Sequence, residues 1–114
     1  MSAPRSAAHQ RRREATARCL AAAATLAPGR RVSVDVDAVP LWTGAPRAEG
    51  STLRYVATAW SGPSPRAKAI ASAEGAPLAW GADTQSTVAE GLARAVEALA
   101  DEMERRVALT THTA

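Results

Sequence analysis

A long amphipathic helix in the last third of the chain is the strongest structural signal in the sequence. Over residues 88–107 apolar side chains recur every three or four positions, which places them on one side of an α-helix that must be buried. Thr87 followed by Glu90 fits a capping box, so the helix is predicted to begin near Thr87. Gly91 lies beside the apolar positions and predicts the close approach of a neighbouring element. On the opposite side, three acids precede arginines by four residues, a stabilising spacing: Glu90 with Arg94, Asp101 with Arg105, and Glu102 with Arg106.

A second helix is predicted over residues 9–27. This segment consists of good helix formers and is followed by Pro28 and Gly29, a pair that commonly stands just beyond a helix end. Residues 1–8 have no apolar period and predict a flexible basic arm, while residues 110–114 predict a frayed tail. The side chains expected to be buried, with Arg11 and Arg18 pointing away from them, are Thr16, Cys19, Leu20, Ala23, Leu26 and Ala27.

The middle of the chain predicts three or four antiparallel strands. Residues 31–39 alternate valine with polar side chains, which is typical of a strand with one wet face. Residues 52–61 carry apolar side chains on both faces, which favours a central strand. Residues 66–73 lie between a proline and a glycine and are short, which favours a strand over a helix. Residues 77–82 predict a short strand or an extended approach to the last helix.

This order of elements predicts a single α+β domain over residues 9–109. The domain is expected to contain a helix, a three- to four-stranded antiparallel meander and a long C-terminal helix, with both helices on one face of the sheet. The order resembles that of double-stranded-RNA-binding domains, which also run helix, three strands, helix. That family's phosphate-binding lysines open its second helix, whereas the matching stretch here is Gln85-Ser86-Thr87-Val88. The resemblance therefore extends to the order of elements and implies no RNA-binding residue.

Positive charge is concentrated in the N-terminal part of the chain. Residues 1–31 contain seven arginines and one acid and have a net charge of +6, whereas the rest of the chain has a net charge of −3. Such a split indicates a polyanionic partner or an intramolecular contact, and arginine forks suit phosphate oxygens. We therefore expect a small, non-enzymatic regulatory protein that binds nucleic acid. The expected phosphate contacts are Arg5, Arg11, Arg12, Arg13 and Arg18.

Two other interpretations of the arginines remain open. The run at residues 11–13 is equally well explained as a solvated helix start or as a brace against the acidic remainder of the chain. Arg30 and Arg31 follow the predicted helix end, where positive charge also suits the helix dipole.

A protein-binding adaptor or inhibitor, of the kind that mobile elements encode, is the alternative function. Trp42 lies in a proline-flanked turn and is the expected exposed anchor. Arg54 and Trp60 share one face of the strand at residues 52–61 and would form a base-stacking or protein-docking surface if that face were open. We expect Trp60 to lie in the core instead, because large aromatic side chains are scarce in this chain.

Signals for catalysis or metal binding are weak. Both histidines, His9 and His112, lie near the ends of the chain, and Cys19 among alanines predicts a small buried thiol. Asp35 and Asp37 share one face of a strand, but the spacing supplies no third metal ligand and a wet strand face predicts the same pattern. We therefore expect no catalytic residue, no metal and no cofactor.

The remaining sequence features concern location and partners. A single cysteine requires no oxidising compartment, and no segment has the length and apolar character of a membrane span. The sequence thus predicts a cytoplasmic protein whose partner is nucleic acid or protein rather than a membrane. It leaves the oligomeric state open, a homodimer included.

Overall fold

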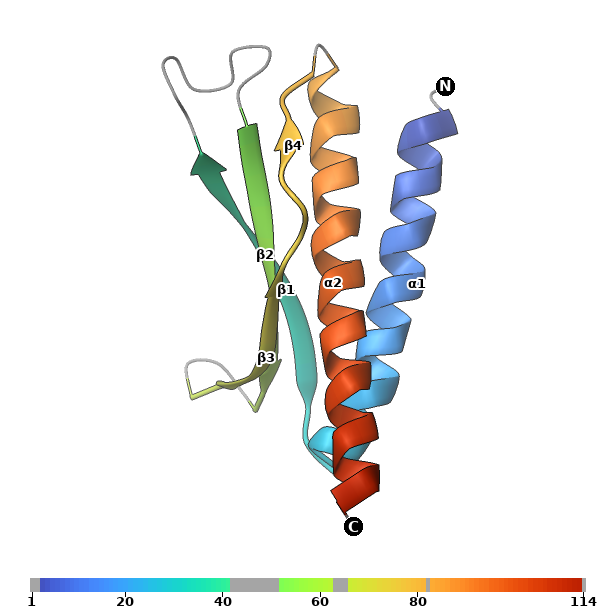
Figure 1. The fold of residues 1–114 in the computed structure, drawn as a ribbon, viewed down its shortest axis with the longest axis vertical. Coiled ribbons are helices and arrows are strands. Elements are labelled where there is room, and N and C mark those ends of the chain that lie inside the picture. The colour runs from blue at the N-terminus through green and yellow to red at the C-terminus, as the bar shows by residue number, and fades with distance from the viewer. Residues whose placement is uncertain (1–2, 42–51, 63–65, 82, 114) are drawn as a thin grey trace.

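The computed structural model describes residues 3–41, 52–62, 66–81 and 83–113. Its two helices and four strands form an α+β fold with both helices on one side of an antiparallel sheet, as predicted (Figure 1). In chain order the elements are α1 (Ala3–Leu26), β1 (Val32–Leu41), β2 (Thr52–Ser61), β3 (Lys68–Glu74), β4 (Leu78–Ala79) and α2 (Thr84–Thr113).

Strand β2 is the centre of the sheet, as its two-sided apolar pattern predicts. It pairs with β1 along one edge, and with β3 and then the short β4 along the other, always antiparallel. Burial alternates along β2, with Leu53, Tyr55, Ala57 and Ala59 buried and the residues between them half-buried. The buried set faces the helices, and no element that the structure describes covers the other face, which we call the open face.

The two helices lie at different depths behind the sheet. Helix α2 packs directly on β2 and β3, whereas α1 packs along α2 and contacts chiefly β1 among the strands. The first turns of both helices lie at the same end of the molecule, so the helices run parallel (Figure 1). The chain must therefore return through the sheet between them. Within the described residues, neither helix is both long and apolar enough to span a bilayer.

Small side chains fill the contact between α1 and α2. Buried residues recur at spacings of four and three on both helices, the period that keeps one side of a helix facing a partner. Only a few large side chains, among them Leu53, Leu99 and Met103, are fully buried. Alanine allows the helix backbones to approach closely but removes little apolar area from water. The buried residues that follow this spacing are Ala8, Ala15, Cys19 and Ala22 on α1, and Ala89, Ala93, Val96 and Ala100 on α2.

Both helices extend beyond their predicted bounds. Helix α1 begins at Ala3, so residues 3–8 are helical rather than an irregular arm, and Ala8 is buried against α2. Helix α2 continues to Thr113, past the predicted end at residue 109. In the same way, β1 runs two residues past the predicted end at residue 39. Packing along a long partner stabilises terminal turns that have weak signals of their own.

The start of α2 also differs from the predicted capping box. The carboxylate of Asp83 accepts hydrogen bonds from the backbone N–H groups of Gln85 and Ser86, at 3.1 and 3.3 Å, and so caps a helix that begins at Thr84. Thr87 lies inside the helix, where its hydroxyl oxygen accepts a hydrogen bond from the backbone N–H of Gly81 at 3.1 Å. Asp83 and Thr87 are both good cap residues, and the capping box selected the wrong one.

The predicted buried face of α1 is wrong in part. Cys19 and Ala23 are buried as expected, but Leu20 is 45% exposed. Arg11 and Arg18, which were expected to point away, reach across to α2. The reason is that the partner of α1 is an alanine-lined helix, which accepts small side chains, while long arginine stems flank the contact.

Candidate nucleic-acid interface

Arg11, one of the predicted phosphate contacts, forms ion pairs with acids of α2. Its Nη2 and Nε donate to both carboxylate oxygens of Glu97, at 2.6 and 3.1 Å, and its Nη1 donates to Glu90 Oε1 at 2.8 Å. Glu90 also accepts a hydrogen bond from Arg94 Nε at 2.8 Å. Burial raises the pKa of Glu90, but the hydrogen bonds from Arg11 and Arg94 outweigh burial, so this pKa lies below its ordinary value.

Arg18 repeats this arrangement two turns further along α1. Its Nε and Nη2 donate to both oxygens of Glu104, at 2.9 and 2.6 Å, and Nη2 also contacts Asp101 Oδ1 at 2.7 Å. Hydrogen bonds from Arg18 lower the pKa of Glu104, and the acids in turn raise the pKa of the guanidinium. For Arg11 and Arg18, the brace against the acidic remainder of the chain is therefore the interpretation that the structure supports.

Arg12 and Arg13 do not join this pair. Arg13 is exposed, and its Nη2 donates to Gln10 Oε1 at 2.7 Å on the same helix. Arg12 is half-buried and, together with His9, Arg13 and Thr16, lines a shallow hollow on α1. Arg5 lies in the first turns of α1, but its side chain is outside the described part of the structure. The structure thus does not unite the four arginines with described side chains into one surface.

A different group of cations lies at the end of the sheet where β1 and β3 begin. We call this group the basic corner. Its residues come from two connections that are distant in sequence, the α1–β1 turn and the segment that leads into β3. The sheet register brings these segments together, because the backbone N–H of Gly62 donates to the carbonyl of Arg31 at 2.9 Å and Ser61 lies opposite Lys68. The basic corner consists of Arg30, Arg31, Arg66 and Lys68.

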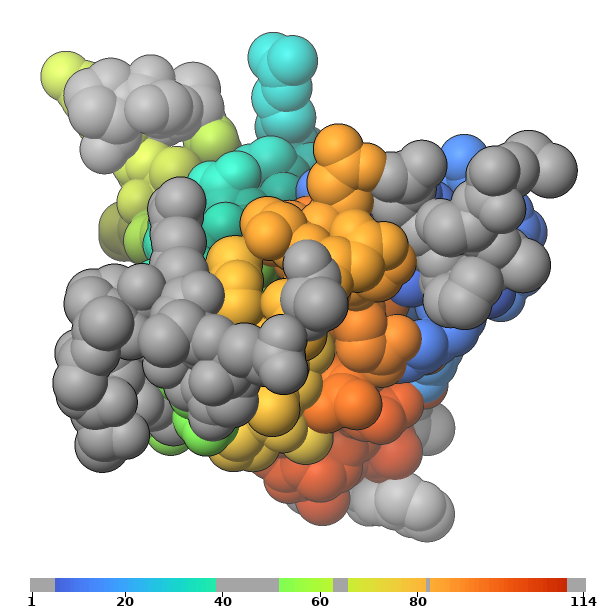
Figure 2. Space-filling model, turned by 90° about the horizontal axis from the view of Figure 1, so that it is seen from above, coloured from blue at the N-terminus to red at the C-terminus, as the bar shows by residue number. Residues whose placement is uncertain are grey.

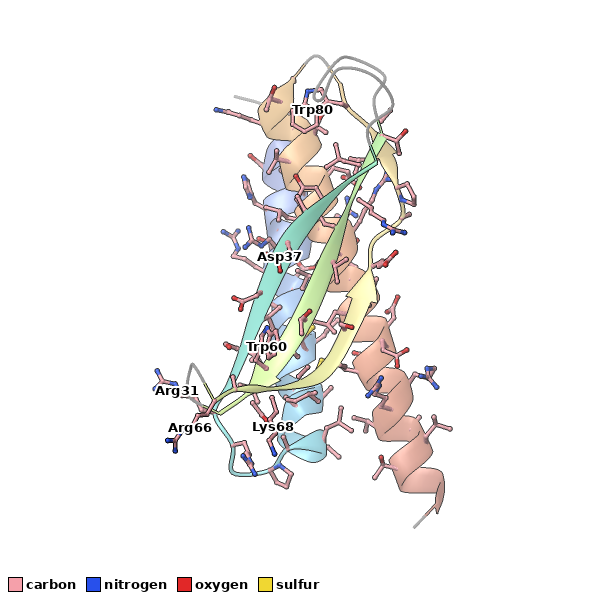
Figure 3. All side chains as sticks on the ribbon, turned by 90° about the vertical axis from the view of Figure 1, so that its left-hand side faces the viewer. Arg31, Asp37, Trp60, Arg66, Lys68 and Trp80 are labelled. Atoms are coloured by element: carbon pink, nitrogen blue, oxygen red, sulfur yellow. The ribbon has the colours of Figure 1, made fainter. Side chains whose placement is uncertain are left out.

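All four side chains of the basic corner are exposed. None of them forms an ion pair with an acid among the residues that the structure describes. Figure 3 shows Arg31, Arg66 and Lys68 at one end of the sheet, with Trp60 next along its open face. Neighbouring strands lie about 4.8 Å apart. Arg31 directly precedes β1 and Lys68 begins β3, so their backbones are separated by two strand spacings, about 10 Å. The corner therefore presents a compact patch of uncompensated positive charge.

The sequence contains only part of the signal for this corner. Arg30 and Arg31 are visible as cations beyond a helix end, but nothing in their neighbourhood links them to Arg66 and Lys68. That link depends on the antiparallel register of three strands. Two glycines with positive φ stand at the turns concerned, Gly29 at 75° and Gly62 at 96°, and these are conformations that glycine adopts without strain.

Trp60 lies on the open face of the sheet, contrary to the expectation of a core position. It is half-buried and belongs to the set that alternates with the buried residues of β2. Both helices cover the opposite face, so the scarcity of aromatic side chains did not decide its position. Arg54 lies on the same open face, where its Nη1 is 2.6 Å from Glu74 Oε2. Trp42 lies outside the described residues.

The cysteine, the paired aspartates and the histidines form no cluster with one another among the described residues. The thiol of Cys19 is fully buried, its nearest acceptor is the carbonyl of Val96 at 3.8 Å, and burial raises its pKa to about 11, as expected of an inert thiol. Asp35 and Asp37 are exposed on β1. In the described part of the chain, no three His, Cys, Asp or Glu side chains gather as metal ligands would. His9 is exposed, and the side chain of His112 is not described.

A wide hollow on the described surface lies far from the basic corner. It is an open groove of about 680 Å³ between the first turns of the two helices, lined by Ser6 and His9 of α1 and by Val88 and Leu92 of α2, among others. Figure 2 views the molecule from this end, with α1 in blue beside α2 in orange. Among the described residues that line it there is no arginine, lysine or acid. The groove and the basic corner are thus separate features.

Comparison with known proteins adds no functional information. No protein-family model, no curated protein and no solved structure matches this chain. The candidate interface is therefore defined by its own geometry and charge.

Proposed function

We propose that this protein binds nucleic acid through phosphate contacts made by the basic corner. The observation that carries the proposal is the convergence of Arg30, Arg31, Arg66 and Lys68 at one end of the sheet, exposed and without an ion-pair partner among the described residues. Arginine and lysine on such a surface gain by neutralising phosphates and releasing counterions. A patch of four cations about 10 Å across matches a short stretch of nucleic acid backbone.

The charge of the whole molecule supports this assignment. The chain has a formal net charge of +3 and an isoelectric point near 10. The acids of α2 are largely engaged with Arg11, Arg18, Arg94, Arg105 and Arg106, so among the described residues they neutralise arginines elsewhere and leave the four cations of the corner without an acid partner. A polyanion approaching the molecule is therefore drawn to that end.

The N-terminal helix contributes a second, weaker candidate surface. Arg12 and Arg13 remain without an acid partner among the described side chains, whereas Arg11 and Arg18 would have to leave their ion pairs to reach a phosphate. With a rise of 1.5 Å per residue, Arg13 lies about 20 Å along the helix axis from the end of α1 next to the corner. The two surfaces can therefore be tested separately.

The test compares two double variants in fluorescence anisotropy with a labelled oligonucleotide of about 12 nucleotides, a length within the usual range of site sizes. If about four phosphates are neutralised, the logarithm of the binding constant should fall with the logarithm of salt concentration with a slope of about −3. Replacing Arg66 and Lys68 with alanine should reduce that slope by about 1.4. The matched control, alanine at Arg12 and Arg13, should leave it unchanged.

Two results would contradict the proposal. If the unmodified protein binds neither DNA nor RNA at low salt, nucleic acid binding itself is wrong. If the variant at Arg12 and Arg13 loses affinity and the variant at Arg66 and Lys68 does not, the contact lies on α1 rather than at the corner.

A protein-binding adaptor remains the second candidate function. The observation in its favour is the open face of the sheet, where Val56, Thr58 and Trp60 are half-buried and no described element covers them. An adaptor would hold its partner at high salt, because apolar burial is not screened. Capture of one protein that survives high salt and is lost on Trp60→Ala or Trp42→Ala would favour this function over nucleic acid binding.

A further inference from the structure

We infer that the nucleic acid is single-stranded and that one of its bases stacks on Trp60. This inference rests on the proposed function, because it names the form of nucleic acid that the basic corner takes. It starts from the surroundings of the indole on the open face of the sheet. A base stacks on an aromatic side chain only if the ring has a free face and small neighbours.

The neighbours of Trp60 are small on every side of the sheet. Across the strands, Trp60 lies opposite Ser33 of β1 and Ala69 of β3. Along β2, the residues two positions away are Thr58 and Gly62. Side chains directly opposite each other on a sheet have Cβ atoms about 5 Å apart, so a larger side chain in any of these places would stand against the ring. The residues directly beside the half-buried Trp60 on this face are thus all smaller than its ring.

The sheet also changes register at this tryptophan. The pairing of β2 with β3 shifts between Ala59 and Trp60, so that Ala59 lies opposite Ala71 but Trp60 lies opposite Ala69. Such a bulge bends the strand locally and changes the direction of the side chain beside it. Trp60 thus lies one residue before Ser61, which pairs with Lys68 at the start of β3.

The distribution of charge sets the path of the bound strand. The cations lie beyond Trp60 at the end of the sheet, while Asp35, Asp37 and Glu74 lie further along the open face. A phosphate backbone would be repelled by these acids if it ran up the strands. The strand therefore crosses the end of the sheet from Arg31 to Arg66, with one base turned inward onto Trp60. Lys68, opposite the buried Ser61, lies at the helix-facing side of the same end and adds positive charge there.

A duplex fits this arrangement poorly. Bases in a duplex are stacked on one another and present only their edges in the grooves, so a tryptophan that stands on a flat sheet cannot reach their faces. A base in a single strand is free to turn, and stacking on an aromatic ring tolerates any sequence. The geometry thus selects single strands of DNA or RNA.

The experiment measures binding of single-stranded and double-stranded oligonucleotides of equal length to four proteins: the unmodified chain, Trp60→Ala, Trp60→Phe and Val56→Ala. The unmodified chain should bind the single strand more tightly than the duplex. Trp60→Ala should weaken single-strand binding roughly 5- to 150-fold, the range for loss of one stacked base. Trp60→Phe should restore most of the affinity, because phenylalanine keeps a flat ring. Val56→Ala, on the same face but next to the acids, should change nothing.

The outcomes separate this inference from the function on which it rests. If neither form of nucleic acid binds the unmodified chain, the proposed function fails. If the duplex binds as tightly as the single strand, or if Trp60→Ala binds the single strand normally, the function stands and the stacking inference is wrong. The comparison of the two oligonucleotides needs no variant, so a folding defect in Trp60→Ala, visible by circular dichroism, leaves the inference testable.

Discussion

At the scale of single residues, two glycines determine how closely the sheet and α2 can pack. A Cβ atom at Gly91 would lie 2.2 Å from the ring of Tyr55, and one at Gly75 would lie 2.8 Å from the backbone nitrogen of Ala95. The ring of Tyr55 therefore rests directly on the backbone of α2. In an alanine-rich core this contact supplies one of the few large buried surfaces, since Tyr55 is buried.

The first prediction follows from this contact. Glycine to alanine in the middle of a helix normally stabilises it by about 1 kcal/mol. Gly91→Ala should instead lower the free energy of unfolding by about 1 to 3 kcal/mol, because the added methyl group must displace the ring of Tyr55. Urea denaturation measures the change. An increase in stability would show that Tyr55 is not held against α2 in solution.

At the scale of elements, α1 is held to α2 by two different kinds of contact. Alanines and Cys19 make the close central contact, and Arg11 and Arg18 bind four carboxylates of α2 from its flank. Each arginine makes a bidentate contact with one glutamate and a single hydrogen bond to another acid. Such a bidentate contact stabilises the fold more than an ordinary surface ion pair, because the planar guanidinium already has the geometry that a carboxylate accepts.

Arg11 provides the second prediction. Arg11→Ala should lower the free energy of unfolding by about 1 kcal/mol, at the upper end for a half-exposed ion pair, and the loss should shrink at high salt. Arg13→Ala is the matched control, because Arg13 is exposed on the same helix and contacts only Gln10 among the side-chain partners described for it. Denaturation of the two variants side by side checks the difference. Equal effects would mean that the Arg11 contacts contribute nothing.

The elements themselves were predictable where a period or a stop signal was strong. Residues 52–61 were assigned as a central strand from their two apolar faces, and the structure has the same bounds for β2. The start of α2 was not predictable, because Asp83 and Thr87 are both good caps and only the tertiary contact of Thr87 with Gly81 separates them.

The candidate interface was less predictable than the elements. The charge split predicted a cation-rich surface or an intramolecular contact, but it could not tell which arginines served each purpose. Arg11 and Arg18 could be assigned to α2 only once the parallel arrangement of the helices was known. The basic corner needed the register of β2 with β1 and β3, and the placement of Trp60 needed the knowledge of which face the helices cover.

At the scale of the whole molecule, the carboxylates that bind arginine make stability depend on pH. Hydrogen bonds from Arg105 and Arg106 lower the pKa of Glu102 from 4.5 to about 2, and the pKa values of Glu90 and Glu104 are lowered as well. A carboxylate whose pKa is lower in the folded state stabilises that state above its unfolded pKa. This stabilisation is lost as pH falls and the folded protein must take up protons.

The third prediction is therefore an acid transition with a defined window. The melting temperature should stay level from neutral pH down to about 4.5 and then fall as the pH approaches 2. Circular dichroism melts across this range measure it. In the Glu102→Gln variant the melting temperature should fall less steeply with pH, because glutamine does not titrate. A melting temperature that rises on acidification would contradict the ion pairs with α2.

The parallel arrangement of α1 and α2 also bears on how the molecule forms during synthesis. Helix α1 leaves the ribosome first, yet the surface on which it packs is made only after the entire sheet. Its alanine face and its two clamping arginines stay without their partner until then. Contacts between segments so distant in sequence slow folding. A nascent chain that ends before α2 would carry a free basic helix, which is open to chaperones and to the ribosome's own RNA.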